Sequence, residues 1–348
     1  MELKLKPFCQ ININDPFFDS LRADYAEFGQ WFARKAHDLA YVFEDEQGVN
    51  GFLYLKIENE AVNDVTPALP ARRRLKVGTM KINARGTRLG ERFIKKIFDH
   101  ALHFGVEEIY VTVFAAHATL ITLFTRYGFA SVGEKHSANG VENVLLKRFV
   151  MHGRGLMENY PMINLNRGNI YLLSLYPQWH TRLLPDSILH NEDAAVLEDI
   201  SHTNSIHKVY LAKMDRLDQL RPGDVLVIYR TSDGQGPAHY RSVATSVGVV
   251  EDYRNIHTFA SRQEFLDYCR PYSVFTEAEL EAFWNRKTYP HVFRFTYNAA
   301  LKRRVTRGEM IENMGLDPNA YWGFMPLTRG QFQAIAQAGQ LDESLIVN

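Results

Sequence analysis

Cysteine is scarce in this sequence, with only Cys9 and Cys269 among 348 residues. Two cysteines this far apart exclude a disulfide framework and a zinc site built from cysteines. Long apolar runs are also missing, and none approaches the length of a membrane span. Residues 1–7 alternate charged and apolar side chains, unlike a signal peptide. We therefore expect a cytoplasmic protein with no membrane partner and no metal site.

An excess of one charge is missing too, since 40 Lys and Arg residues balance 40 Asp and Glu residues. This balance excludes the global basic field of many nucleic-acid binders, so any RNA contact must depend on local patches. Repeats and low-complexity segments are absent. What the chain does have is a globular composition, 46% hydrophobic, and enough length for two domains of ordinary size.

The first 150 residues predict a mixed α/β domain. Leu89, Phe93, Ile97 and Ala101 recur every four residues, which predicts a helix after Gly90. We expect one strand, two helices, three strands, a helix, a strand, a helix and a final hairpin. The expected strands cover residues 3–13, 39–43, 51–57, 75–82 and 108–114, the hairpin covers 129–149, and the other helices lie in 17–35 and 118–127.

The connection Asn83-Ala-Arg-Gly-Thr-Arg-Leu-Gly90 joins a predicted strand to a predicted helix. The first-turn N–H groups of a helix have no partner within the helix, and the helix dipole favours an anion there. Gly86 and Gly90 would let the backbone approach a phosphate group closely. The alternative is an ordinary strand–turn–helix connection in which the glycines only satisfy turn geometry.

Two linked motifs resemble those of the GNAT family of acetyl-CoA-dependent N-acyltransferases. Arg85-Gly-Thr-Arg-Leu-Gly90 is similar to the family motif Gln/Arg-x-x-Gly-x-Gly/Ala, with Arg88 replacing the middle glycine. His117-Ala-Thr-Leu-Ile-Thr-Leu-Phe-Thr-Arg-Tyr-Gly-Phe129 is similar to Asn-x-x-Ala-x-x-x-Tyr-x-x-x-Gly-Phe, with His for Asn and Phe124 for Tyr. The resemblance covers residues 1–150 and implies a GNAT-type mixed sheet with flanking helices.

The resemblance also implies acetyl-CoA as the cofactor. The backbone of the strand before the glycine turn would bind the pantetheine arm, and the turn would bind the pyrophosphate with added charge from its arginines. The cofactor-binding residues that it implies are Met80, Lys81, Ile82, Arg85, Gly86, Thr87, Arg88, Leu89 and Gly90.

Candidate catalytic residues are His117 and Tyr127. Phe124 stands where the family has its usual acid, and Tyr127 is the nearest phenol, about one helical turn further on. His117 could act as a base at neutral pH. The alternatives are a capping or packing histidine and a core tyrosine. Residues 72–80 offer no carboxylate at an evident base position, so catalysis by proximity with a water relay and loss of catalysis both stay open.

A basic run, Arg72, Arg73 and Arg74, leads into the strand at 75–82. A charge run is ordinarily a solvated loop. The alternative is a patch that draws an anionic substrate such as RNA.

The second half predicts a small β-barrel with helices, from short strands around Gly and Pro turns over 169–348, after a linker at 151–168. Arg221-Pro-Gly-Asp-Val-Leu-Val-Ile-Tyr229 and Gly248-Val-Val-Glu251 resemble the PUA-like superfamily, which includes ASCH and EVE domains. The resemblance implies RNA as a partner, bound by aromatic stacking and basic contacts. The candidate residues, each of which alone also fits a packing or surface role, are Trp179, His180, Arg182, Tyr229, Arg230, Arg241 and Trp322.

Together the two resemblances lead to one main hypothesis, an acetyl-CoA-dependent N-acetyltransferase that acts on RNA, tRNA included, or on an RNA-associated target. Phe124 and Arg88 motivate a second, a non-catalytic acyl-CoA-binding regulator with a nucleic-acid-reading domain. A third is a protein or small-molecule acetyltransferase whose second domain only shapes the substrate cleft. Oligomeric state does not follow from the sequence.

Overall fold

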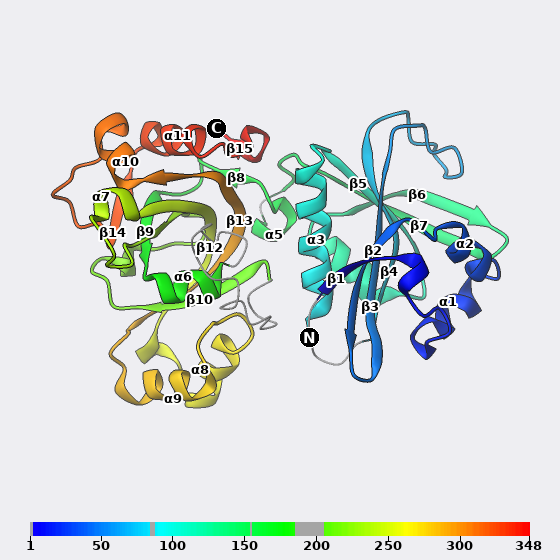
Figure 1. Cartoon of the computed structure of the whole chain (residues 1–348), viewed down its shortest axis with the longest axis horizontal. Coiled ribbons are helices and arrows are strands. Elements are labelled where there is room, and N and C mark those ends of the chain that lie inside the picture. Colours follow the sequence, from blue (N-terminus) through cyan, green and yellow to red (C-terminus); the bar gives the residue numbers. More distant parts are fainter. Residues whose placement is uncertain (1–2, 84–87, 154, 185–204) are drawn as a thin grey trace. The chain divides into compact units, whose positions relative to one another are not determined.

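A computed structural model describes residues 3–83, 88–153, 155–184 and 205–348 of the chain (Figure 1). The chain divides into two compact units, Met1–Asn159 and Tyr160–Asn348. The boundary falls inside the segment 151–168 that the sequence predicted to be a linker. Asn159 donates to the Gly155 carbonyl, Tyr160 donates to the Tyr297 carbonyl and Ile163 pairs with Ile346, so residues on each side of the boundary are bound within their own unit.

The first unit is built on a mixed sheet with the strand order β1-β2-β3-β4-β5-β7-β6 in the described part of the chain. β4 and β5 run parallel to each other, and the other neighbouring pairs are antiparallel. The strands are β1 (Leu3–Pro7), β2 (Leu39–Asp45), β3 (Gly48–Glu58), β4 (Arg74–Ile82), β5 (Glu108–Phe114), β6 (Ala130–Ser137) and β7 (Gly140–Arg148).

Helices cover both faces of this sheet (Figure 1). They are η1 (Phe8–Gln10), η2 (Pro16–Phe18), α1 (Asp19–Asp24), α2 (Phe28–Arg34), α3 (Leu89–His103), α4 (Ala118–Arg126) and α5 (Leu156–Asn159). Side chains alternate between the faces along β3. Phe52 and Tyr54 join the aromatic core under α1 and α2. Gly51 lies under α3, where a Cβ would come within 2.6 Å of Leu89.

The predicted elements of this half are confirmed with small shifts at their ends. The main difference is the first strand, which was expected to reach residue 13 but ends at Pro7. Phe8 then turns inward as the start of η1 and packs against the rings of Phe32 and Phe52. Burial of this aromatic side chain therefore outweighs continuation of an edge strand.

The second unit contains a mixed sheet with the order β10-β13-β12-β11-β9-β14, in which β9 and β11 are parallel. Its strands, with the short pair β8 and β15, are β8 (Ile163–Asn164), β9 (Ile170–Leu175), β10 (His207–Ala212), β11 (Val225–Arg230), β12 (Val243–Asn255), β13 (His291–Thr306), β14 (Phe324–Leu327) and β15 (Ile346–Val347). The described helices are α6 (Pro177–Leu183), η5 (Leu217–Gln219), α7 (Ala238–Arg241), η6 (Ile256–Thr258), α8 (Arg262–Cys269), α9 (Glu277–Arg286), α10 (Arg307–Met314), α11 (Arg329–Ala338) and η7 (Glu343–Leu345).

Register shifts bend the long strands of this second sheet. β12 shifts against β13 between Ala244 and Ser246, between Val247 and Gly248, and between Val250 and Asp252. Each bulge bends a strand and increases its twist. Within the described residues β10 and β14 form the two edges, so the barrel expected from the sequence takes the form of a bent mixed sheet. The predicted mixed α/β class is confirmed for both units.

Candidate functional site

A fork between two parallel strands organises the first unit. β4 and β5 pair over Leu75–Val77 and Ile109–Val111, but both strands continue beyond these residues. A bulge at Gly78 coincides with the separation, because Tyr54 of β3 pairs with Thr79 and Leu55 pairs with Val77. Glycine is required there, since a Cβ would lie 2.6 Å from the Tyr54 ring. The bulge bends β4 away from β5 and opens a cleft.

The cleft has a volume of about 370 Å³ and lies on the face of the sheet covered by α1 and α2. Side chains from β4, β5 and β7 form its floor, among them Lys76, Thr79, Thr112, Phe114 and Glu142. An apolar cover comes from the helices above, with Leu21, Tyr25, Phe28 and Trp31. His117 and Leu120, at the start of α4, complete the lining. The site is therefore a concave pocket in which charged and polar groups of the floor face an apolar cover, and concave sites with convergent polar groups commonly bind ligands.

Glu142 is the central acidic group of this floor and is only 4% exposed. Its Oε1 accepts a 2.8 Å hydrogen bond from the Tyr25 hydroxyl and a 3.1 Å bond from Thr112 Oγ1. Its Oε2 has no hydrogen bond within the described residues. Burial, with the nearby Glu142 charge, raises the pKa of Tyr25 far above the usual range of a phenol, so Tyr25 stays protonated at neutral pH.

Sequence reasoning missed Glu142, although a signal for it exists. On β7, Glu142 has the same strand parity as Val144 and Leu146, which are both buried. A carboxylate on the apolar face of a strand is costly unless it is paired, so its occurrence there indicates a function or a partner. Residues 72–80 are the expected place for a base, whereas Glu142 lies on β7 opposite Phe114 of β5.

A second polar group lies on the same floor around Glu58. Its carboxylate accepts a hydrogen bond from Tyr110 and lies 3.1 Å from Lys56 Nζ and 3.7 Å from Lys76 Nζ. Burial raises the pKa of Glu58, but the Tyr110 hydrogen bond and the lysine charges outweigh it and leave the pKa below its ordinary value. Burial also lowers the pKa of Lys76, by more than the Glu58 charge raises it.

The two predicted catalytic residues have different surroundings. His117 lines the cleft, is half-exposed, and has its Nε2 3.4 Å from Asp24 Oδ2. Its carbonyl accepts the Leu120 and Ile121 N–H groups, while its side chain makes no capping hydrogen bond. Tyr127 is fully buried, packs against the ring of Phe98 and does not line the cleft. Its burial fits the core alternative, and a proton donor to a ligand in the cleft would need access that Tyr127 lacks.

The predicted cofactor residues fall on both sides of residues 84–87, which lie outside the described part of the chain. Met80, Lys81 and Ile82 form the end of β4 beyond the fork, where they are half-buried. The Lys81 ammonium donates to Ser20 Oγ and lies 5.0 Å from the Phe17 ring centre. Arg85, Gly86 and Thr87 lie outside the described residues.

The start of α3 holds three of the predicted cofactor residues, and their surroundings differ. Arg88 begins the helix with a left-handed backbone, φ 51°, and its half-exposed guanidinium is 3.9 Å from Glu91. Leu89 is buried in the core. A Cβ on Gly90 would lie 2.9 Å from Leu123 of α4, so helix packing also favours glycine here. Among Arg88, Leu89 and Gly90, Arg88 therefore has the solvent-exposed side chain.

The basic run at 72–74 is divided between the core and the surface, with Arg74 buried and Arg72 and Arg73 exposed. Arg74 is buried and donates from Nε to Glu108 Oε2 at 2.9 Å, while Arg72 approaches the same carboxylate at 3.6 Å. Arg148 donates to Glu108 at 2.8 Å, and Arg73 donates to the Phe104 carbonyl. The sequence could not show this, because Glu108 lies 34 residues beyond Arg74 and meets it only through the pairing of β4 with β5.

Most of the predicted RNA-binding residues are packed inside the second unit. His180 is fully buried, and its Nε2 lies 2.8 Å from Thr245 Oγ1. Arg230 is buried as well, and Arg241 forms an ion pair with Asp233. Burial, followed by the charges of Arg230 and Arg304, lowers the pKa of His180 to about 3, so this imidazole is neutral at pH 7.

The four remaining candidates form two separate ring contacts. The Arg182 guanidinium lies 5.3 Å from the Trp179 ring centre and donates to the Val274 carbonyl at 2.6 Å. The rings of Tyr229 and Trp322 lie 5.3 Å apart, and both residues are buried. The most exposed tyrosines of the second unit are other residues, Tyr176, Tyr240 and Tyr321, which are 65%, 70% and 56% exposed.

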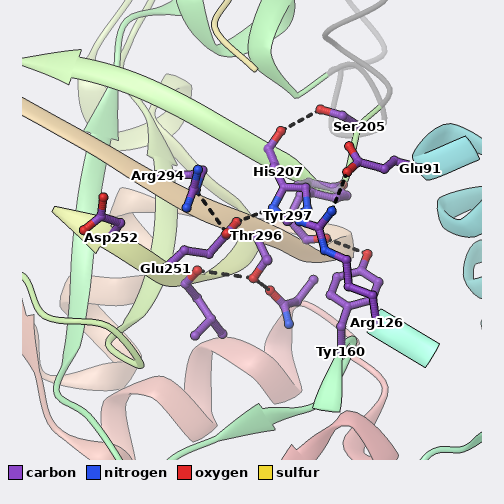
Figure 2. Close-up of polar contacts among 12 residues, drawn as sticks. Glu91, Arg126, Tyr160, Ser205, His207, Glu251, Asp252, Arg294, Thr296 and Tyr297 are labelled. Carbon is purple, nitrogen blue, oxygen red and sulfur yellow. Dashed lines mark hydrogen bonds and ion pairs between the residues drawn. The ribbon is translucent and has the colours of Figure 1, made fainter. Parts of the chain in front are cut away.

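A chain of polar contacts in the second unit, in which His207 is buried and Arg294 is partly exposed, also escaped sequence reasoning. Glu251 joins His207 Nδ1 at 2.5 Å to Arg294 Nε at 3.1 Å (Figure 2). The His207 ring also contacts Tyr272, 4.8 Å between ring centres. These residues link β10, β12 and β13, so the chain fixes three neighbouring strands together. Among the described residues, no group of His, Cys, Asp and Glu could hold a metal ion, and no helix is long and apolar enough to cross a membrane.

Several solved structures match parts of this chain at low sequence identity. A chain in the crystal structure of the NatC complex bound to Gag peptide and CoA is 16% identical, with 43% of this chain and 100% of that chain covered and a TM-score of 0.30. The IAA acetyltransferase from Bacillus cereus is 12% identical, with 42% and 98% covered and a TM-score of 0.31. A point mutant of ZmASCH from Zymomonas mobilis is 9% identical, with 49% and 95% covered and a TM-score of 0.30. No family model and no curated protein sequence matches this chain.

Proposed function

We propose that the first unit is an acyl-CoA-dependent N-acyltransferase, in which an amine meets the thioester in the cleft at the β4–β5 fork. The observation that carries the proposal is the fork itself. Beyond Val77 and Val111 the two parallel strands no longer pair, so backbone groups of both face the cleft. An extended chain with amide groups, such as a pantetheine arm, can hydrogen-bond to such a strand edge.

The cofactor would be held by backbone and by charge. The end of β4, from Met80 to Ile82, would bind the pantetheine arm. The N-terminus of the long helix α3, together with Arg88, would bind the pyrophosphate, because first-turn N–H groups and the helix dipole favour an anion. Arg85, Gly86 and Thr87 stay predictions for the same role.

The chemistry would depend on Glu142. An acceptor amine must lose a proton to attack the thioester carbonyl. Glu142 Oε2 can take that proton, directly or through a water, because Tyr25 and Thr112 bind only Oε1. The C–N bond forms as the C–S bond breaks, and CoA leaves as the thiolate. Tyr25 orients the carboxylate, and its raised pKa makes it a weak proton donor. His117 remains a candidate base beside the same cleft.

The acceptor is proposed to be an amine on RNA, tRNA included, or on an RNA-associated target. The support comes from the three most exposed tyrosines of the second unit, Tyr176, Tyr240 and Tyr321, since exposed rings offer stacking faces to unpaired bases. The buried His180 and Arg230 lend no support to it. A peptide or small-molecule amine is the alternative acceptor, and it needs only the cleft.

Transfer of a labelled acetyl group from acetyl-CoA tests the proposal with three acceptor pools: bulk tRNA, peptides with free N-termini, and small polyamines. We expect one pool to be labelled by the full-length protein. Glu142→Gln should lower the rate by about 10²-fold or more and retain acetyl-CoA binding, as expected for loss of a general base. Glu107→Gln, an exposed substitution outside the cleft, is the matched control.

Labelling of tRNA that falls steeply with added salt would support the RNA part, and labelling of peptides or polyamines alone would contradict it. If no pool is labelled although acetyl-CoA binds, the non-catalytic regulator becomes the better account.

A further inference from the structure

Two lysines of the cleft, Lys56 and Lys76, lie directly opposite each other on β3 and β4. Both approach the carboxylate of Glu58, at 3.1 Å and 3.7 Å. Their exposure differs, since the Lys56 side chain is 48% exposed and the Lys76 side chain 25%. The Lys76 ammonium also lies 5.4 Å from the centre of the Tyr110 ring. The same sheet face therefore holds one solvated lysine and one lysine enclosed by the cleft.

Lys76 stands next to the fork. It precedes Val77, the last residue of β4 that pairs with β5, so its Cα is about 3.3 Å along the strand from the start of the fork. Under the proposed function, the thioester of a bound acyl-CoA lies at this point. Burial lowers the pKa of Lys76, which increases the neutral, nucleophilic fraction of its amine at pH 7.

We infer that Lys76 is itself an acyl acceptor, so that the protein acylates this lysine when an acyl-CoA occupies the cleft. The inference rests on the proposed function. Lys76 Nζ attacks the thioester carbonyl carbon, the C–N bond forms, and the C–S bond breaks to release CoA as the thiolate. The proton that the nitrogen loses passes to the Glu58 carboxylate and on to solvent, and the thiolate is protonated from solvent.

The modification would change the cleft. An acylated Lys76 is a neutral amide, so its ion pair with Glu58 is lost, while Lys56 still neutralises that carboxylate. The added acyl group would occupy the floor of the cleft beside the fork. Self-acylation would therefore slow transfer to other acceptors.

Incubation of the full-length protein with acetyl-CoA, followed by peptide mapping in a mass spectrometer, tests the inference. We expect Lys76 to be acetylated faster than Lys56 by on the order of tenfold or more, because proximity to the bound thioester accelerates only Lys76. Random acetylation in solution would favour the more exposed Lys56. Lys76→Arg should remove the fast reaction, whereas Lys4→Arg, on the edge strand β1, should leave it unchanged.

Calorimetry on the same preparation measures whether acetyl-CoA binds. The result distinguishes failure of the self-acylation inference from failure of the proposed function. If acetyl-CoA binds and Lys76 is acetylated no faster than Lys56, the self-acylation inference is overturned and the proposed function stands. If acetyl-CoA does not bind, the proposed function is overturned, and the inference with it.

Discussion

Tyr25 and Glu142 lie 117 residues apart in the sequence, yet the Tyr25 hydroxyl donates a 2.8 Å hydrogen bond to Glu142 Oε1. The bond joins the segment after α1 to β7 across the cleft. It therefore holds the proposed base in position and ties the helical cover to the floor of the cleft.

Tyr25→Phe should weaken this tie without opening a cavity. A hydrogen bond to a carboxylate contributes about 1.5–3 kcal/mol, so we expect the free energy of opening of β7 to fall by about 1.5 kcal/mol. Hydrogen exchange of β7 amides measures it. Tyr41→Phe is the matched control, because Tyr41 is a half-buried phenol whose hydroxyl has no hydrogen bond within the described residues. An equal loss of protection in Tyr25→Phe and Tyr41→Phe would contradict a stabilising hydrogen bond between Tyr25 and Glu142.

Arg88→Glu should weaken acetyl-CoA binding. The substitution reverses a half-exposed charge at the start of α3, where the proposed pyrophosphate site lies. We expect a loss of about tenfold in affinity, or about 1.4 kcal/mol, in a calorimetric titration at low salt. Lys96→Glu makes the same charge change two turns further along the helix and should have little effect. A similar loss of acetyl-CoA affinity in both variants would indicate a general electrostatic effect of the added charge and would contradict a local pyrophosphate site at Arg88.

Gly128 and Gly105 both have positive φ, at 81° and 58°, but their surroundings differ. A Cβ on Gly128 would lie 2.1 Å from the Glu158 carbonyl oxygen, whereas a Cβ on Gly105 would have no atom within 4 Å. Gly105→Ala should thus cost about 1 kcal/mol from backbone strain alone. Gly128→Ala should cost about 1–3 kcal/mol more, because α5 must move. Urea unfolding of the two variants, monitored by hydrogen exchange of peptides from the first unit, measures both losses in the free energy of unfolding.

His180 predicts a pH dependence of stability in the second unit. Its folded pKa of about 3 lies below the ordinary value of 6.5, so the unfolded chain binds the proton more tightly. The contribution of neutral, buried His180 to the free energy of unfolding is fully present above pH 6.5. It is lost as the pH falls from 6.5 towards 3, by about 1.4 kcal/mol per pH unit at most. Urea unfolding at several pH values should show a shallower loss for His180→Gln. If the free energy of unfolding falls equally with pH in the unchanged protein and in His180→Gln, His180 does not cause the pH dependence.

Local patterns in the sequence were enough to predict the first unit. The helical spacing of α3, the alternation in β5 and the hairpin turn before Gly140 each depend on neighbouring residues, and each predicted element is present. In the second unit, the helix starts at Thr276, Thr306 and Thr328 carry capping boxes that the sequence also displays. Such signals need no knowledge of tertiary contacts.

Charged and polar side chains were harder to assign, because their partners are distant in sequence. Arg74 is held by Glu108, and His180 by Thr245 on a strand 65 residues further on. The basic run and a histidine near aromatic residues predicted binding surfaces, but Arg74 and His180 belong to buried hydrogen-bond networks, while Arg72 and Arg73 stay exposed. For Glu142, the alternation of β7 predicts a buried position on an apolar strand face. Its hydrogen-bond partner Tyr25 cannot be predicted in this way, because it is distant in sequence.

In the proposed function, the edges of β4 and β5 beyond Val77 and Val111 bind acyl-CoA. Amides at this edge that lack a strand partner should exchange with solvent quickly and become protected when a ligand binds. The direct measurement is hydrogen exchange of the full-length protein with and without acetyl-CoA. The account predicts slower exchange in residues 78–82 and 112–114 and no change in residues 39–45 of β2. Unchanged exchange in 78–82 at an acetyl-CoA concentration that saturates the protein would contradict it.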